Sequence, residues 1–152
     1  DLPPILDYNI RNNRTYMYFR GEPLFPFGHG LTYTTFDYSA MVTDRKAISS
    51  GDTLKVSLSL KNTGNYDSDE VVQLYVSFPD SKVERPPVAL KGFRRVHVEK
   101  GESRRVTIPV VADDLSYWDT EQHAFVLEKG KVIIRAGASS ADLRLKTVIT
   151  VR

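Results

Sequence analysis

The stretch that decides the fold is residues 54–61, which read LKVSLSLK. Leucine or valine stands at every even position, and lysine or serine at every odd one. Side chains on a β-strand point to opposite faces in turn, so this alternation predicts a strand with one buried and one solvent-facing side. The alternation returns over residues 71–78, where both rows are partly apolar, and this indicates a central strand.

Further strands are expected on both sides of this pair. They are residues 35–42, 88–98, 104–110, 124–127, 131–136 and 143–151. Glycine precedes several of these runs and accepts the positive φ that short hairpin loops require. Within residues 88–98 the apolar row loses its phase after Gly92, which predicts a bulge.

No segment has a helical period over ten or more residues, although Asp113 could cap one short helical turn. About seven to eight short strands with glycine turns predict an all-β fold, an antiparallel immunoglobulin-like β-sandwich. The chain has no cysteine and therefore lacks the disulfide of immunoglobulin domains. The fibronectin type III-like variety is accordingly expected.

The N-terminal region has a different composition. Residues 1–38 contain nine of the sixteen aromatic residues and four of the eight prolines. Proline-rich sequence does not form a regular helix or a central strand. We therefore expect an extended aromatic arm, residues 1–33, that lies across a surface, while residues 34–152 form the sandwich. Phe25, Phe27 and Tyr33 are expected to anchor the arm to its own sandwich, and Pro3 to Tyr18 to pack on a neighbouring domain.

Length and composition exclude several classes of protein. A chain of 152 residues with 41% hydrophobic and 26% charged residues is typical of one globular domain. The chain has no apolar run approaching the ~20 residues of a membrane span, so no membrane partner is expected. The net charge of +2 comes from 21 basic and 19 acidic residues that are interspersed, so no nucleic-acid partner is expected. No charged-then-apolar signal segment follows Asp1, which is interpreted as a cut end.

Candidate catalytic chemistry is sparse. The histidines, His29, His97 and His123, have no metal-ligand spacing, and there is no cysteine to assist them, so no metal and no cofactor are expected. Paired carboxylates could serve glycoside hydrolysis. The acidic clusters at 67–70, 113–114 and 119–121 are instead interpreted as solvated turns, so no catalytic residue is predicted. Tyr117 and Trp118 form an aromatic pair that could contact carbohydrate or could belong to the core or its rim.

The arm carries the most specific motif. Residues 23–36, PLFPFGHGLTYTTF, resemble a motif of the C-terminal fibronectin type III-like domain in glycoside hydrolase family 3. Residues 14–19, 62–64, 70–76, 90–96 and 101–103 resemble further signatures of that domain, although Asn13 stands where glycine is usual. The resemblance covers nearly the whole chain, from about Leu2 to Val151.

The resemblance implies a parent enzyme, a retaining β-glycosidase of carbohydrate metabolism, whose catalytic residues lie in upstream domains. The chain alone is therefore expected to be an inactive, non-catalytic structural domain, with the upstream catalytic domains of its own polypeptide as its partners. The linker form favours β-xylosidase slightly over β-glucosidase. The resemblance also implies an extracytoplasmic location, periplasmic or secreted.

These expectations place function on two sets of side chains. Packing against the catalytic domains is assigned to aromatic residues of the arm: Tyr16, Tyr18, Phe19, Phe25, Phe27 and Tyr33. Contact with a polysaccharide is assigned to Tyr117 and Trp118. The alternatives are a carbohydrate-binding sandwich, or an adhesion or protein-interaction sandwich unrelated to enzymes.

Overall fold

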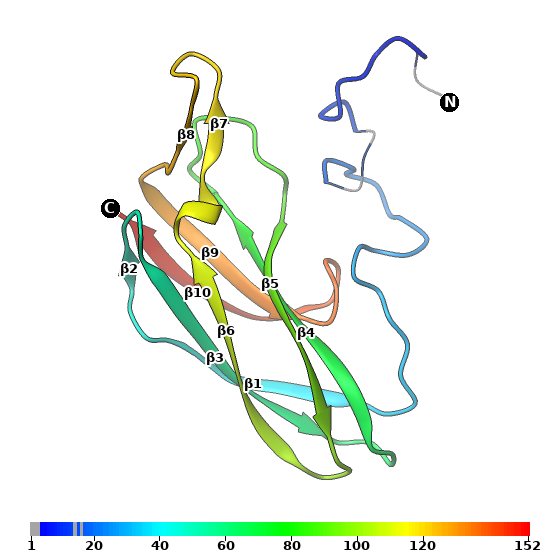
Figure 1. Ribbon diagram of the computed structural model, residues 1–152. Helices are drawn as coiled ribbons and strands as arrows, with labels where there is room; N and C mark the ends of the chain where they lie inside the picture. The colour runs from blue at the N-terminus through cyan, green and yellow to red at the C-terminus, as the bar shows by residue number, and fades with distance from the viewer. Residues whose placement is uncertain (1–3, 14, 16) are drawn as a thin grey trace.

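A computed structural model describes residues 4–13, 15 and 17–152. Within that part the chain is all-β, with one short 3₁₀ helix (Figure 1). The elements are β1 (Phe36–Thr43), β2 (Ala47–Ile48), β3 (Thr53–Asn62), β4 (Ser68–Ser77), β5 (Ala89–Val98), β6 (Ser103–Val111), η1 (Asp113–Leu115), β7 (Tyr117–Asp119), β8 (Ala124–Val126), β9 (Gly130–Gly137) and β10 (Leu143–Val151).

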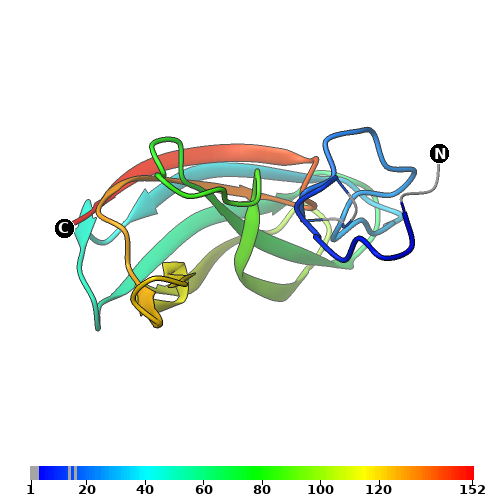
Figure 2. The same ribbon diagram turned by 90° about the horizontal axis from the view of Figure 1, so that it is seen from above.

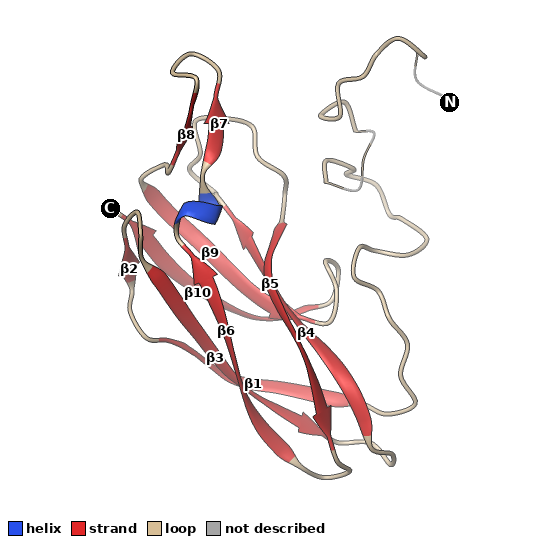
Figure 3. Ribbon diagram, viewed as in Figure 1, coloured by secondary structure: helices blue, strands red, loops and turns tan. Residues whose placement is uncertain are grey.

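The long strands form two sheets that face each other. One has the strand order β1-β3-β6 and the other the order β2-β10-β9-β4-β5, while β7 and β8 pair with each other in a separate hairpin. Pairing is antiparallel throughout except between β2 and β10, which are parallel. Figure 3 shows the helical turn η1 between β6 and the β7–β8 hairpin.

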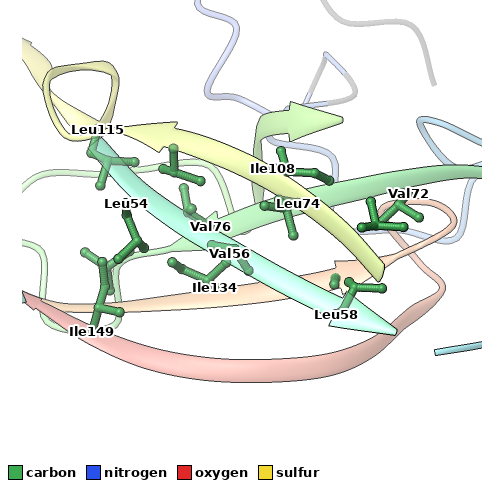
Figure 4. Packing of buried hydrophobic residues seen from close by; sticks show 14 of the residues in the cluster. Leu54, Val56, Leu58, Val72, Leu74, Val76, Ile108, Leu115, Ile134 and Ile149 are labelled. Atoms are coloured by element: carbon green, nitrogen blue, oxygen red, sulfur yellow. The ribbon is translucent and has the colours of Figure 1, made fainter. Parts of the chain in front are cut away.

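Alternating side chains of both sheets build the core. Leu54, Val56 and Leu58 of β3 are at most 2% exposed. They face Leu74 and Val76 of β4, and the cluster also includes residues of β1, β2, β5, β6, β9, β10 and η1 (Figure 4). The alternation in residues 54–61 therefore marks one wall of the core, as the sequence predicts.

The expected number of strands, about eight, was too low, since ten are described. The two that the sequence missed, β2 and β7, contain two and three residues, too few to show an alternation. The bulge expected at Gly92 is confirmed, because the β4–β5 register shifts between the Leu74–Gly92 and Tyr75–Leu90 pairs. The helical turn at Asp113 is also confirmed. Its carboxylate does not cap that turn, however, but accepts hydrogen bonds from Ser50 and Gly51.

A buried polar residue fixes the place where the N-terminal arm joins the sandwich. The Asn62 side chain is fully buried, and its Oδ1 accepts hydrogen bonds from Thr34 Oγ1 at 2.7 Å and from the Gly64 amide at 3.1 Å. Its Nδ2 donates to the carbonyls of Tyr66 and Val98. Because every polar atom of this side chain is bonded, the start of β1 is held in one position.

The arm itself, in its described residues, contains turns but no strand or helix. It lies beside the sandwich rather than between the sheets, in both views (Figures 1 and 2). Within the described residues there is no helix long and apolar enough to cross a membrane.

Candidate interdomain interface

The arm is attached to the sandwich through its main chain at Phe27 and Gly28. The Phe27 carbonyl accepts the amide N–H of Ser140 at 2.9 Å and lies 3.3 Å from the Tyr75 hydroxyl. The Gly28 carbonyl accepts a hydrogen bond from Gln73 Nε2 at 3.1 Å. The arm therefore meets both β4 and the loop between β9 and β10.

Gln73 is the centre of this attachment. It belongs to the row of β4 that points away from the core, yet its side chain is only 5% exposed because the arm covers it. Its second amide hydrogen goes to the Ala138 carbonyl at 2.6 Å, and its Oε1 accepts the Tyr75 hydroxyl proton at 2.6 Å. Burial raises the pKa of Tyr75 to about 12, so that this hydroxyl stays protonated as a donor.

Glycine is required at position 28. Its φ is +80°, a region that L side chains rarely adopt. A Cβ there would lie 2.1 Å from Gln73 Oε1, whose side chain is fixed by its hydrogen bonds and cannot move aside cheaply. The arm can approach β4 this closely because residue 28 has no side chain.

The side chains expected to anchor the arm do not do so. Tyr33 is 94% exposed, Phe25 is 67% exposed and Phe27 is 41% exposed. The prediction that these rings pack on their own sandwich is therefore wrong for Tyr33 and Phe25, and Phe27 contributes mainly through its carbonyl. The sequence could not reveal this, because the arm is held by main-chain hydrogen bonds, which do not depend on the identity of the side chains. Gly28 is the exception, since its place in the attachment requires glycine.

The remaining arm residues of the prediction have mixed positions. Tyr18 is half-buried and Phe19 is 41% exposed. Tyr16 lies outside the described residues. The assignment of all six aromatic residues to contact with another domain stays a prediction.

Two hollows flank the anchor and join the arm to the outer face of the sheet. One, of about 580 Å³, is bordered by Phe19, Phe25, Tyr75, Val88 and Leu90. The other, of about 450 Å³, is bordered by residues 27–32 together with Val71, Gln73 and Phe93. Phe93 is 67% exposed and faces outward beside Gln73. Sequence reasoning missed Phe93 as a surface residue, although the loss of phase after Gly92 was the available signal.

Exposed apolar side chains are concentrated in the arm. Among the described residues, the large hydrophobic side chains of the arm that are at least 36% exposed are Ile5, Leu6, Tyr8, Ile10, Met17, Phe19, Leu24, Phe25, Phe27, Leu31 and Tyr33. Soluble domains rarely leave so many apolar side chains together in water, and such patches mark contact sites. This surface can therefore bury apolar area on contact with another molecule.

One carboxylate near this surface, that of Asp69, is already paired. The carboxylate of Asp69 accepts from Arg95 Nε and contacts His97 Nδ1, each at 2.7 Å. These two partners hold the pKa of Asp69 below its ordinary value. Asp69 and Glu70 lie in β4 rather than in the turn that the sequence predicted. In the part of the chain that the structure describes, no group of three acidic or histidine side chains could hold a metal ion.

The two residues of the predicted carbohydrate contact are neighbours on β7, in the β7–β8 hairpin. Tyr117 is partly buried and lies against the guanidinium of Arg85, whereas Trp118 is 51% exposed. Both residues nevertheless border one hollow of about 630 Å³, and their contact with a polysaccharide stays a prediction.

Comparison with known proteins identifies the domain type. The family model described as the fibronectin type III-like domain matches residues 70–140. Thermostable β-glucosidase B of Acetivibrio thermocellus is 42% identical over 130 residues, which cover 86% of this chain and 17% of that protein. The crystal structure of DesR, a β-glucosidase from Streptomyces venezuelae in complex with D-glucose, is 35% identical with a TM-score of 0.82, over 90% of this chain and 18% of that chain.

A protein of Formosa agariphila named as a β-xylosidase is 33% identical over 135 residues, or 89% of this chain and 18% of that protein. The comparisons give no support to a preference for β-xylosidase, since the more similar relatives above are β-glucosidases. In each case this chain spans less than a fifth of the relative's length. The chain belongs to the fibronectin type III-like domains of glycoside hydrolase family 3.

Proposed function

We propose that this chain is the C-terminal, non-catalytic structural domain of a retaining β-glycosidase, and that it stabilises the arrangement of the catalytic domains. Residues 1–33 serve as the linker and arm from the preceding catalytic domain, and residues 34–152 as the sandwich. The names of the relatives favour a β-glucosidase as the parent enzyme. A periplasmic or secreted location belongs to the same proposal.

One observation carries the proposal: the arm is fixed by its main chain while its apolar side chains face away. A segment that served only to cover its own sandwich would bury those side chains. Because the backbone of the arm is already fixed, less conformational entropy is lost when a partner binds to it. Leu31 and Tyr33, which are 92% and 94% exposed, are thereby presented to a neighbouring surface.

The energy available from such a contact is considerable. Burial of apolar surface contributes about 25 cal/mol per Å², or about 1.5–3 kcal/mol for each large side chain that becomes fully buried. A few arm residues would therefore be sufficient to fix the orientation of two domains, given that whole domains are stable by only about 5–15 kcal/mol.

The test compares the same double substitution, Leu31→Ser with Tyr33→Ser, in this chain and in the parent enzyme. In the 152-residue chain we expect little change in melting temperature, because both side chains are exposed. In the parent we expect a lower melting temperature, by the equivalent of about 2–4 kcal/mol, and reduced activity. Thermal unfolding and hydrolysis of an aryl β-glucoside are the measurements.

Val148→Thr is the control, because Val148 is 47% exposed but lies on β10, outside the arm. It should leave both proteins unchanged. If the double substitution leaves the parent's melting temperature and activity unchanged, the arm does not hold the catalytic domains. If it destabilises the isolated chain as much as the parent, the two side chains serve the sandwich instead.

A further inference from the structure

A cluster of polar side chains lies where β1 meets the opposite sheet. Tyr38 of β1 belongs to one sheet, whereas Glu70 of β4 and Arg144 of β10 belong to the other. Glu70 continues the row of Val72 and Leu74, which are fully buried between the sheets. Its carboxyl group therefore lies at the end of the core, beside a hollow of about 680 Å³ that Tyr38 and Arg144 also border.

The guanidinium of Arg144 is engaged by other partners. Its Nε and Nη2 donate to the two carboxylate oxygens of Asp142, at 2.9 and 2.6 Å, and its Nη1 donates to the Phe36 carbonyl. Its Cζ lies 4.7 Å from the centre of the Tyr38 ring. Arg144 therefore holds the start of β1 against β10, and Asp142 is its counter-ion.

Glu70 is the second carboxylate beside this single guanidinium. One cation and two carboxylates give the cluster a net charge of −1 when all three are ionised. Glu70 Oε1 accepts the amide N–H of Val71 at 3.1 Å. The Tyr38 hydroxyl acts on the same carboxyl group, yet it is buried and makes no hydrogen bond of ordinary geometry among the described residues.

The surroundings of Glu70 disfavour its charge. Burial and the charge of Asp142 raise the pKa of Glu70, and they outweigh the opposite effects of Tyr38, Val71 and Arg144. Burial and the nearby Glu70 raise the pKa of Tyr38 as well, so its hydroxyl stays protonated. Glu70 is thus the member of the cluster whose charge changes above the ordinary range of a carboxyl group.

Other charged or titratable groups border the two hollows that Glu70 adjoins. They come from the arm, β1, β3, β4, the β9–β10 loop and β10, and are His29, Asp37, Lys61, Asp69, Asp142 and Arg144. Lys61 lies opposite Asp37 in the β1–β3 register, and Asp69 is paired with Arg95 and His97. All of these groups are retained when Glu70 alone is replaced, so a comparison with such a variant isolates the effect of Glu70.

We propose that Glu70 is a pH-sensitive switch between the two sheets, in which the neutral carboxyl holds β1 against β4 and β10 and the ionised carboxylate loosens that contact. A neutral carboxyl can donate to or accept from the Tyr38 hydroxyl, and it needs no counter-ion. A carboxyl whose pKa is raised by folding contributes stability below its unfolded pKa, and that contribution is lost as the pH rises through the folded pKa. The contact should therefore be tighter in mildly acidic than in neutral solution.

The switch lies within this chain and does not depend on the proposed role of the arm. Because β1 begins directly after the arm, the switch contributes to how firmly the end of the arm is held.

Amide hydrogen exchange of the 152-residue chain tests the switch. The bulge in β1 separates residues 36–39, next to the cluster, from residues 42–43, which serve as an internal control. After correction for intrinsic exchange rates, we expect protection within residues 36–39 to rise as the pH is lowered from about 7 to about 5. Protection that does not rise there, or that rises equally in residues 42–43, overturns the proposal.

A matched pair of variants assigns the effect to one carboxyl group. Glu70→Gln should remove the pH dependence and keep residues 36–39 protected at pH ~7, because its side chain is always neutral. Asp69→Asn is the control, since Asp69 is the adjacent residue on the opposite face of β4, and it should retain the pH dependence. A pH dependence that persists in Glu70→Gln would assign the effect to another group.

A second measurement needs no variant and therefore does not rely on Glu70→Gln folding. The carboxyl carbon of Glu70 in the wild-type chain is followed by NMR as the pH is changed, together with that of the exposed Glu121. Glu70 should titrate at a higher pH than Glu121. A midpoint equal to or below that of Glu121 would show that the fold does not favour the neutral form, and the switch would be excluded.

Discussion

At the scale of single residues, the arm depends on one glycine and one glutamine. Gln73 uses both amide hydrogens and its carbonyl oxygen to connect the arm, the β9–β10 loop and Tyr75. A buried amide with all its groups bonded specifies one geometry, because any displacement leaves a polar group unpaired. Gly28 is the counterpart that allows the arm's carbonyl to reach this amide.

Gly28→Ala should detach the arm locally. The new Cβ would meet Gln73 Oε1 and would also occupy a positive φ, a combination expected to cost about 1–3 kcal/mol. Faster limited proteolysis within residues 17–33 is the expected result. Gly30→Ala is the control, since a Cβ at Gly30 meets nothing within 4 Å. Cleavage of both variants at the wild-type rate would mean that the bonds at residues 27 and 28 do not hold the arm.

The sequence pointed to this site only in part. The family motif contains Gly28, and the outward row of β4 contains Gln73, but nothing in the pattern pairs two residues 45 positions apart. The reverse holds for Tyr33, whose aromatic character suggested anchoring although it is 94% exposed. An aromatic side chain in the sequence is expected to be buried, but the sequence does not show which surface will bury it.

At the scale of elements, every free edge of the two sheets is interrupted. β1 has a bulge between Ser39 and Val42, where Ala40 has a φ of 51°. β6 contains Pro109, β5 contains the bulge at Gly92, and β2 has only two residues. Interrupted edges resist pairing with strands of other molecules. The sandwich is therefore suited to contact other domains through side chains rather than by adding strands.

Glu128 connects the 3₁₀–β7–β8 region to the loop before β5. Its carboxylate accepts from the Lys82 amide at 2.8 Å and Ser81 Oγ at 2.7 Å, and it pairs with Arg85. Burial acts to raise the pKa of Glu128, but these donors and the charge of Arg85 together hold it below its ordinary value. A depressed carboxyl pKa contributes stability above the pKa of the unfolded chain, and that contribution is lost as the pH falls through the folded pKa.

Glu128→Gln should therefore destabilise the chain in a pH-dependent way. At pH 7 we expect a loss of about 1–3 kcal/mol, because a charged acceptor is replaced by a neutral one beside Arg85. The difference from wild type should shrink below pH ~4, where the wild-type carboxylate begins to take up a proton. Denaturant unfolding between pH 3 and 7 measures the difference in the free energy of unfolding between the variant and the wild type. Glu121→Gln, at an exposed position, is the control. A difference that is constant over this range would exclude the ion pair as its cause.

At the scale of the whole molecule, the core and the arm are separate. All residues of the buried apolar cluster lie between Phe36 and Val151. Carbonyl groups of the arm accept hydrogen bonds from Gln73 and from the Ser140 amide, but the arm contributes no side chain to that cluster. The stability of the sandwich should thus depend little on residues 1–33.

A chain of residues 34–152 should fold cooperatively. Uncovering Gln73 and Tyr75 allows water to bond their polar groups, so the expected loss in the free energy of unfolding is about 1–3 kcal/mol. A shorter chain, 45–152, lacks β1 and Phe36 and exposes one side of β3, so it should lose cooperative unfolding. Denaturant titration compares the two. If residues 34–152 fail to fold, the arm belongs to the sandwich and the proposed boundary is wrong.

The sequence by itself determined the all-β fold, most strand positions and the bulge at Gly92, because alternation and glycine placement are local consequences of strand geometry. Only the tertiary structure decided how the arm attaches, which rings face solvent, and that Trp118 pairs with Phe125 rather than with Tyr117. Those outcomes depend on main-chain hydrogen bonds and on the face of a three-residue strand. Neither is encoded in the identity or the spacing of the side chains along the chain.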